Sequence, residues 1–242
     1  MDCKICGAKN PFILFNESLN RYDESTKTYI CTNCYVIYNP TEHSSDTVQE
    51  AFEASQAEVV STYYKIEEGD IKKVHAEVAA KSGIVEWLLA EVPTLKRGTL
   101  VDIGTGSGVL AVAAGRFFNH VYATDLDISQ AISTIQVAGQ KNVVAVQDFV
   151  SINDKFDVAI MWHTMEHLFD PGQIIEAIKA KMNPGGAVFC QIPFYRKEYL
   201  ENCHVWFYNP ATIKKIKEIY EFRDYRVYFD ATLGFMSFIL FV

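Results

Sequence analysis

The sequence lacks any apolar run that is both long enough and free enough of charge to cross a bilayer. Its opening residues, MDCKICGAKN, also lack the apolar core of a signal peptide. A surplus of basic residues is missing too, because 22 Lys and Arg stand against 30 Asp and Glu, for a formal net charge of −8. These absences predict a soluble, cytoplasmic protein without a membrane partner, and the charge argues against a mainly electrostatic grip on nucleic acid.

Internal repeats and low-complexity tracts are absent as well. With 49% hydrophobic residues, the 242-residue chain can bury one sizeable core and still supply a small appendage. Its composition indicates three parts: a cysteine-containing module at residues 1–40, a helical connector at 41–95 and a main domain at 96–242. In the connector, apolar residues follow helical spacing, namely Val74, Val78, Ile84, Val85, Leu88 and Leu89. We expect Tyr63 and Tyr64 to lie in a lid over the ligand.

In the main domain, short β-rich runs alternate with helical patterns, which is typical of a doubly wound parallel sheet. The expected strands are Thr99–Ile103, Val121–Asp125, Val143–Gln147, Phe156–Met161, Ala187–Ile192, Tyr225–Asp230 and Phe235–Phe241. Helices are expected to begin near Ser107, Ile128, Pro171 and Pro210. The link between the last two strands is too short for a parallel crossover, so these strands must be antiparallel. The predicted fold class is therefore α/β, with a seven-stranded, mostly parallel sheet whose last strand is antiparallel.

A glycine-rich loop, VDIGTGSG at residues 101–108, follows the first predicted strand of this domain and precedes a helix. Glycines at such a place let backbone amides approach a ligand closely, so the loop predicts a nucleotide-cofactor site. The dinucleotide fingerprint requires its third glycine one position later, where Val109 stands, which disfavours NAD. A lone loop of this kind can also be a simple turn.

Three acidic residues lie at the ends of three consecutive predicted strands. Asp102 would repel a pyrophosphate but attract the ammonium of a cationic amino-acid moiety, a charge pattern that S-adenosylmethionine (SAM) offers. Asp125 follows Gly104 at about the distance expected for a contact with ribose hydroxyls. Asp148 provides an acceptor for an adenine amino group, and Phe149 provides a ring to stack on it. Ligands of such sheets bind outside the carboxyl ends of the strands, so the three acids predict one SAM site.

The motifs VDIGTGSG, ATDLD, QDF, FDVAIMWHTMEHLFDP and MNPGGAVFCQIP occur in this order, and through them the chain resembles the class I SAM-dependent methyltransferases over residues 99–242. The resemblance implies cofactor-binding roles for Asp102, Gly104, Thr105, Gly106, Asp125, Leu126, Asp148, Phe149 and Trp162. It puts Asp102, Gly104 and Gly106 at the methionine end of SAM. Asp125 would contact the ribose and Asp148 the adenine.

Four of the six cysteines form two CxxC pairs, made by Cys3, Cys6, Cys31 and Cys34. Four thiolates in two such pairs suit a structural zinc, which has no open coordination position and should not be catalytic. A hairpin that pairs Phe12–Phe15 with Thr28–Ile30 would fill the long interval between the pairs. A redox pair or an empty vestige is the alternative. Cys190 is expected to be a buried strand residue and Cys203 a loop residue.

The segment HTMEH, from His163 to His167, follows the strand expected to end beside the transferred methyl group. Methyl transfer from a sulfonium requires alignment of the nucleophile and, where needed, removal of its proton, which an imidazole can accept. His163 and His167 are therefore candidate general bases. The segment also matches the HxxEH pattern of zinc peptidases, but Asp170-Pro171-Gly172 ends the long helix which that motif needs.

Two other interpretations of this segment remain open. Ubiquinone-pathway O-methyltransferases and small-RNA 2′-O-methyltransferases hold a metal through an ExxEH segment and a later histidine. The resemblance to them implies a metal set of His163, Glu166, His167 and His204, with histidine replacing the first glutamate. Alternatively, Glu166 and His167 only cap and brace the loop.

The sequence thus predicts a SAM-dependent methyltransferase with a structural zinc. The combination with a zinc ribbon resembles a subset of bacterial methyltransferases, some of which methylate sugars or other small metabolites, so the expected acceptor is a small metabolite such as a nucleotide-linked sugar. One alternative is an RNA or nucleoside methyltransferase, which the net charge opposes. Another is a non-catalytic protein that binds a partner through its zinc module, which the three intact acids oppose. The sequence defines neither the acceptor nor the oligomeric state.

Overall fold

The computed structural model describes residues 1–40, 71–201 and 203–242 of the chain. Within this part the chain forms two compact units. The first contains residues 1–40 and 163–177 and the described residues of 190–240, and the second contains residues 71–162, 178–189 and 241–242. The expected lid residues Tyr63 and Tyr64 lie outside the described residues.

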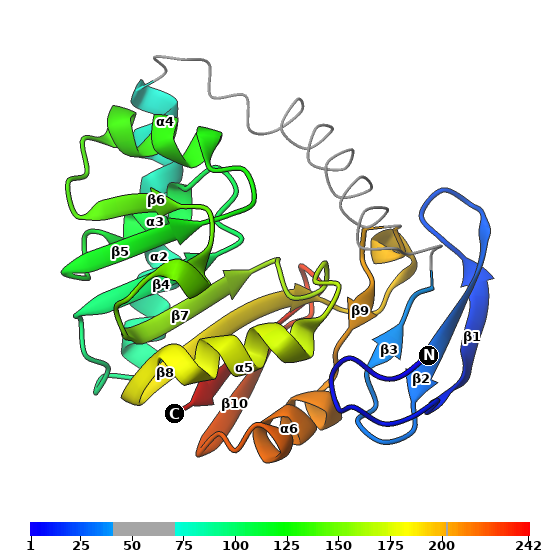
Figure 1. The fold of residues 1–242 in the computed structure, drawn as a ribbon. Helices are drawn as coiled ribbons and strands as arrows, with labels where there is room; N and C mark the ends of the chain where they lie inside the picture. The colour runs from blue at the N-terminus through cyan, green and yellow to red at the C-terminus, as the bar shows by residue number, and fades with distance from the viewer. Residues whose placement is uncertain (41–70, 202) are drawn as a thin grey trace. The chain divides into compact units, whose positions relative to one another are not determined.

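The second unit has the α/β architecture that the sequence predicts (Figure 1). Its parallel strands are β4 (Thr99–Ile103), β5 (His120–Thr124), β6 (Val143–Val146) and β7 (Phe156–Trp162). Strand β4 pairs with both β5 and β7, and β5 pairs with β6. Each of the four strands lies within one residue, at either end, of its predicted position. Helices α2 (Ile71–Glu91), α3 (Val109–Ala114) and α4 (Ser129–Ala138) belong to the same unit.

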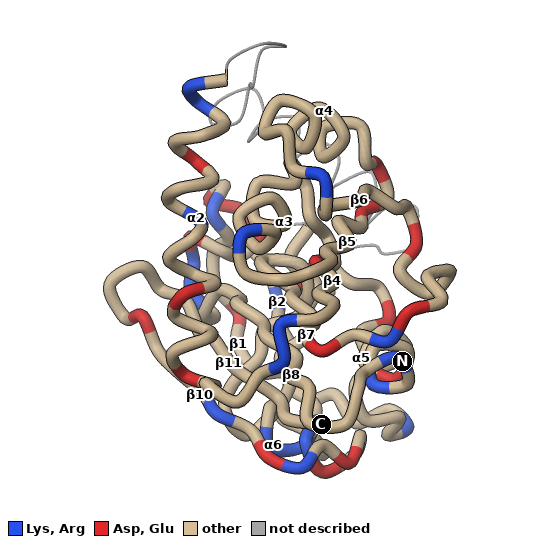
Figure 2. The backbone as a smooth tube through the Cα atoms, turned by 90° about the vertical axis from the view of Figure 1, so that its left-hand side faces the viewer, with Lys and Arg blue, Asp and Glu red and all other residues tan. Residues whose placement is uncertain are grey.

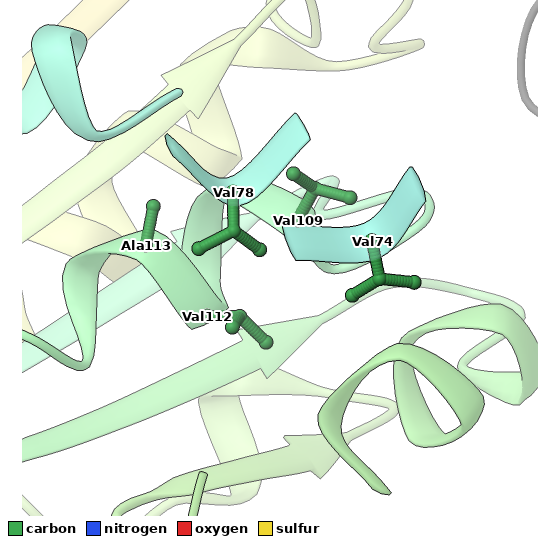
Figure 3. Packing of buried hydrophobic residues seen from close by; sticks show 5 residues of the cluster. All are labelled: Val74, Val78, Val109, Val112 and Ala113. Atoms are coloured by element: carbon green, nitrogen blue, oxygen red, sulfur yellow. The ribbon is translucent and has the colours of Figure 1, made fainter. Parts of the chain in front are cut away.

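Helices α2 and α3 share a hydrophobic core, which Figure 3 shows in close-up. Val74 and Val78, one helical turn apart on α2, pack against Val109, Val112 and Ala113 of α3. All six residues of α3 are buried, so this short helix has no solvent-facing side. Because a helix of six residues is not stable alone in water, its burial against α2 is what holds it, and with it the glycine loop that precedes it.

The main sheet has seven strands in the order β10-β11-β8-β7-β4-β5-β6. The three further strands are β8 (Met182–Pro193), β10 (Asp224–Asp230) and β11 (Phe235–Phe241). The sheet is mostly parallel and ends in antiparallel strands, which confirms the predicted fold class. Strand β8 begins at Met182, five residues before the predicted Ala187, because the segment with Gly185 at φ 80° is already paired with the chain terminus through Val242.

The first unit contains a second, antiparallel sheet built on the cysteine-containing module. Its strands are β1 (Phe12–Leu19), β2 (Ser25–Cys31), β3 (Ile37–Tyr38) and β9 (Trp206–Phe207), in that order. Strands β1 and β2 form the predicted hairpin, which is longer than expected and pairs Phe12 with Cys31. The Trp206 ring packs at 5.1 Å from the Tyr38 ring and 6.5 Å from the Phe12 ring, measured between centroids. A strand more than 160 residues away in sequence thus completes the module's sheet.

The remaining helices are α5 (Pro171–Lys181) and α6 (Pro210–Ile219), and both begin at the predicted prolines. Asn209 caps α6, since its side chain accepts a hydrogen bond from the Thr212 amide at 3.0 Å. No helix in the described part of the chain is both long enough and apolar enough to cross a membrane. Basic and acidic positions are interspersed along the described backbone, as Figure 2 shows.

Candidate active site

The glycine loop starts where β4 ends and leads into α3. Gly104, Gly106 and Gly108 all have positive φ, at 72°, 53° and 77°, a backbone that side chains with Cβ rarely adopt. The amides of Gly104 and the next residue donate to the Thr124 carbonyl at 2.8 and 2.9 Å, which fixes the loop to the end of β5. A Cβ on Gly108 would lie 2.8 Å from the Cα of Ala131, whereas a Cβ on Gly106 would meet nothing within 4 Å. The loop is therefore packed on its helix side and open at Gly106.

Two carboxylates from adjacent strands flank this loop. Asp102, on β4, is 1% exposed and accepts a hydrogen bond from the Thr105 hydroxyl at 2.7 Å. Burial raises the pKa of Asp102 to about 7, although the hydrogen bond from Thr105 acts in the opposite direction. Asp125, directly after β5, accepts a hydrogen bond from the Gly106 amide at 2.8 Å, and burial raises its pKa as well. Two acids that resist ionisation at one loop indicate a place where a positive group of a ligand is stabilised.

A lysine that the sequence reasoning missed adds a positive charge to the same unit. The Lys81 ammonium, on α2, lies over the Trp162 ring at 5.2 Å from its centroid, within the range of a cation–π contact. Burial lowers the pKa of Lys81, and the negative charge of Asp102 acts in the opposite direction. Trp162 ends β7, and its ring packs on Phe189 at 5.8 Å. No motif marks Lys81, since it is an ordinary lysine in a helix until the fold brings Asp102 and Trp162 near.

The third predicted acid lies after β6, the next strand of the sheet. The Asp148 side chain accepts a hydrogen bond from the Val150 amide at 2.8 Å and so caps the short 3₁₀ turn Phe149–Ser151. Phe149 is buried, whereas Leu126, one residue after Asp125, is 67% exposed. The structure therefore places the three acids at the ends of β4, β5 and β6, which are neighbours in the sheet. The apolar side chain that a ligand can reach at this edge is that of Leu126, because the Phe149 side chain is buried.

The predicted histidines gather in the first unit around one buried carboxylate. His163 has a left-handed backbone, with φ 54°, and its Nδ1 lies 3.3 Å from Oε1 of Glu166. Glu166 is fully buried, and its side-chain Oε2 has no hydrogen-bond partner among the described residues. Burial opposes its ionisation, but the hydrogen bond from His163 acts in the opposite direction and lowers the pKa of Glu166. The carboxylate is thus charged and surrounded by imidazoles.

His167 and His204 face one another, with ring centroids 4.7 Å apart. The Nδ1 of His167 lies 2.9 Å from the carbonyl oxygen of Cys203, and the Nδ1 of His204 lies 2.7 Å from that of Tyr199. A carbonyl only accepts, so each Nδ1 carries a proton. Burial lowers the pKa of His167 to about 4, which makes it neutral at physiological pH. The structure thus brings together all four of the predicted residues, and adds Cys203 beside them.

Comparison with known proteins assigns the chain to a family. Residues 76–227, more than half of the chain, match the family model of a methyltransferase domain. The chain belongs to this methyltransferase family. A ubiquinone biosynthesis O-methyltransferase from Aeromonas salmonicida is 24% identical over 153 residues, which are 60% of this chain and 63% of that protein. The chain spans between 42% and 63% of the length of several ubiquinone biosynthesis O-methyltransferases that it matches.

Solved structures show the same fold at low identity. A SAM-dependent methyltransferase from Clostridium acetobutylicum has a TM-score of 0.57 at 14% identity, over 79% of this chain and 99% of that one. An amino pentose methyltransferase from Micromonospora echinaspora, solved with SAM bound, has a TM-score of 0.55 at 10% identity, over 68% of this chain and 91% of that one. This methyltransferase therefore has the fold of SAM-dependent enzymes.

The four cysteines of the two CxxC pairs form one cluster in the first unit. The sulfurs of Cys3 and Cys34 are 3.6 Å apart, and those of Cys6 and Cys31 are 3.7 Å apart. Tetrahedral coordination with Zn–S bonds of about 2.3 Å requires sulfurs about 3.8 Å apart, so the cluster fits a zinc. A hydrogen bond from Cys34 lowers the pKa of Cys3 to about 5, so that a thiolate is already favoured at one of these positions.

The two pairs share one backbone geometry, although their sequences differ. Gly7 and Tyr35, each the residue after a pair, have φ of 68° and 64°. The Gly7 amide donates to the Cys3 carbonyl and the Tyr35 amide to the Cys31 carbonyl, both at 2.9 Å. A tyrosine with a left-handed backbone is uncommon, so the closed turn at the second pair is maintained against the preference of its own residue.

Proposed function

We propose that this methyltransferase transfers the methyl group of SAM to an oxygen or carbon of a small-molecule acceptor. The observation that carries the proposal is the buried Asp102 carboxylate beside the glycine loop, with the Lys81 charge close enough to affect it. The amino-acid end of SAM bears one ammonium and one carboxylate, which these two side chains complement. A pyrophosphate would bring negative charge to Asp102 and Asp125, which disfavours a dinucleotide at this loop.

The remaining residues of the second unit would hold the nucleoside. Asp125 would accept hydrogen bonds from the ribose hydroxyls, because its carboxylate is already aimed at the loop through Gly106. Asp148, at the end of the neighbouring strand, would receive the adenine amino group on the oxygen that does not cap the turn. Leu126 offers an exposed apolar side chain for the face of the base, and Trp162 would wall the pocket together with Lys81.

The bound cofactor would supply a sulfonium whose methyl group the acceptor displaces, and the protein must align the acceptor and remove its proton. His163 is suited to accept that proton, since it is the first residue after Trp162 and its side chain is 32% exposed. Glu166 would orient the His163 ring through the contact to Nδ1 at 3.3 Å and stabilise the imidazolium. The left-handed backbone of His163 supports a functional role, because such strain is common at active sites.

The acceptor we propose is a small metabolite, with a nucleotide-linked sugar as the leading class. The net charge of −8 opposes a polyanionic acceptor such as RNA. Support comes from relatives whose names describe ubiquinone biosynthesis and an amino pentose, respectively. We also propose a structural zinc at Cys3, Cys6, Cys31 and Cys34, which the sulfur distances support.

The experiment that tests this function is calorimetric titration with SAM and with S-adenosylhomocysteine, with elemental analysis for zinc on the same preparation. We expect binding of both ligands in the micromolar range, followed by methyl transfer in a screen of nucleotide sugars with labelled SAM. Failure of the folded, zinc-containing protein to bind either ligand would contradict the proposal and favour a non-catalytic partner-binding role. Transfer to RNA but to no small acceptor would favour the nucleic-acid alternative.

The raised pKa of Asp102 predicts that SAM binding depends on pH. Its folded pKa of about 7 lies above the ordinary 3.8, so the free chain holds a proton there that the ligand ammonium must displace. SAM affinity should therefore rise with pH and be about tenfold lower at pH 6 than above pH 8. In the free protein, the stability contributed by the protonated group is present at low pH and is lost as pH rises through about 7.

Calorimetry from pH 6 to 8, in buffers that differ in their ionisation enthalpy, measures both the affinity and the proton released. The matched control is Asp102→Asn, which keeps the size of the side chain but cannot titrate. It should bind SAM more weakly and without this pH dependence. An affinity of the unsubstituted protein that stays flat over this range would contradict the role of Asp102.

A further inference from the structure

We propose that His167, Cys203 and His204 form a second metal site, selective for zinc or a similar transition-metal ion. One nitrogen from each histidine and the sulfur of Cys203 all lie within 4.8 Å of one another in the first unit. A tetrahedral zinc with bonds of about 2.0 Å to nitrogen and 2.3 Å to sulfur needs these atoms about 3.5 Å apart. The three ligand atoms would have to move by about 1 Å to reach these distances, which small side-chain rotations allow.

Both imidazoles are already oriented as metal ligands are. In each ring the Nδ1 proton is held by a backbone carbonyl, that of Cys203 at 2.9 Å for His167 and that of Tyr199 at 2.7 Å for His204. This fixes the tautomer with the lone pair on Nε2, which is the ring nitrogen that would bind the ion. Backbone carbonyls that hold the second ring nitrogen are the usual outer partners of metal-binding histidines.

The charge around this cluster favours a cation. Glu166 is fully buried, and its Oε1 lies 3.9 Å from Nε2 of His167. Its other oxygen, Oε2, has no hydrogen-bond partner within the described residues, which is costly for a buried carboxylate. A divalent ion held by the neighbouring imidazoles would compensate this charge at short range.

The backbone holds the two halves of the cluster together without the ion. The amides of Val205 and Trp206 both donate to the Glu166 carbonyl, at 2.9 and 3.2 Å. The Tyr208 hydroxyl donates to the Met165 carbonyl at 3.0 Å, and the Trp206 indole donates to a carbonyl of the same loop at 2.8 Å. Residues 165–168 and 203–208 therefore form one preformed unit, so binding an ion orders little additional chain.

The donor set identifies the class of metal. A thiolate with two imidazoles suits zinc, cobalt or iron(II), whereas magnesium and calcium prefer oxygen ligands. The site differs from the set that the family resemblance implies, because Cys203 takes part and neither His163 nor Glu166 is a ligand. Three protein ligands leave one coordination position of a tetrahedral ion open to an oxygen atom. A hydroxyl of the acceptor would bind there, and this last step alone rests on the proposed function.

The test is the number of zinc ions retained per chain after metal removal, reconstitution with zinc alone and desalting through a weak chelator. The unsubstituted protein should retain two, one of them at the four-cysteine cluster. Cys203→Ala and His204→Gln should each retain one. The matched control is Cys190→Ala, which removes another buried thiol, on β8, and should retain two.

Retention of one zinc by the unsubstituted protein, or of two by both ligand variants, would overturn the proposal. Cobalt titration of the unsubstituted protein avoids any dependence on the folding of the variants. The second equivalent should add tetrahedral cobalt bands with about a quarter of the thiolate-to-metal absorbance of the first, because one thiolate instead of four contributes. SAM calorimetry on Cys203→Ala distinguishes the metal site from the proposed function. If this variant loses one zinc but still binds SAM, the loss concerns the metal site alone.

Discussion

Replacing Asp125 with alanine is expected to weaken SAM binding about 100-fold while the chain stays folded. A carboxylate that accepts hydrogen bonds from both ribose hydroxyls contributes about 1.5 kcal/mol or more for each bond, which together correspond to two orders of magnitude in Kd. The substitution also removes the acceptor of the Gly106 amide at 2.8 Å, which loosens the loop at its open side. Because burial raises the pKa of Asp125, the free protein should lose little stability with it.

Calorimetry with S-adenosylhomocysteine measures this effect without turnover of the ligand. Asp127→Ala is the matched control, because Asp127 is exposed, lies two residues further on and carries the same charge. Its carboxylate accepts a hydrogen bond from the Ser129 amide at 2.9 Å, at the start of α4. The control should bind as the unsubstituted chain does, with a stability loss of about 1 kcal/mol or less from the lost hydrogen bond to Ser129. Equal affinity for both variants would show that Asp125 does not contact the ligand.

The parts of the site that the sequence predicts are those encoded over short distances along the chain. Each of Asp102, Asp125 and Asp148 stands beside a run of β-forming residues, so its position at a strand end follows from the strand alone. The glycine loop is similar, because positive φ at Gly104 and Gly106 is a local property. Parallel pairing of β4, β5 and β6 then brings the three ends to one edge of the sheet.

The parts that the sequence does not predict depend on contacts between distant segments. Lys81 becomes a candidate site residue only through its contact with Trp162 and the nearby charge of Asp102, and these two residues lie on other elements. Strand β9 has two residues, too few for any periodic pattern, and it exists because β3 offers it a partner at Ile37 and Tyr38. Cys203 lies in a loop as the sequence predicts, but its burial beside His167 and His204 follows only from the fold. Burial and long-range pairing are tertiary properties, so composition and spacing leave them open.

Replacing Cys31 with serine is expected to remove the zinc of the four-cysteine cluster and to unfold the antiparallel sheet of the first unit. Structural zinc contributes about 10–16 kcal/mol of apparent binding free energy in zinc-finger peptides, which is as large as the whole stability of a typical domain. Cys31 is the last residue of β2, so the site and the hairpin share it directly. Zinc analysis, near-ultraviolet circular dichroism and limited proteolysis of the purified variant measure the outcome.

The expected loss of structure extends beyond the cysteine-containing module, because β3 is paired with β9. Tyr38 and Phe12 pack on Trp206, so loss of the metal should remove the packing on this side of residues 203–208 and make them more accessible to protease. The control is Asn33→Ser, which puts a serine in the same turn, at an exposed position, and keeps all four thiols. It should retain zinc and resist the protease as the unsubstituted protein does. If Cys31→Ser lost its zinc and remained protected at residues 203–208, the metal would not stabilise this sheet, and the aromatic packing around Trp206 would be sufficient to hold it.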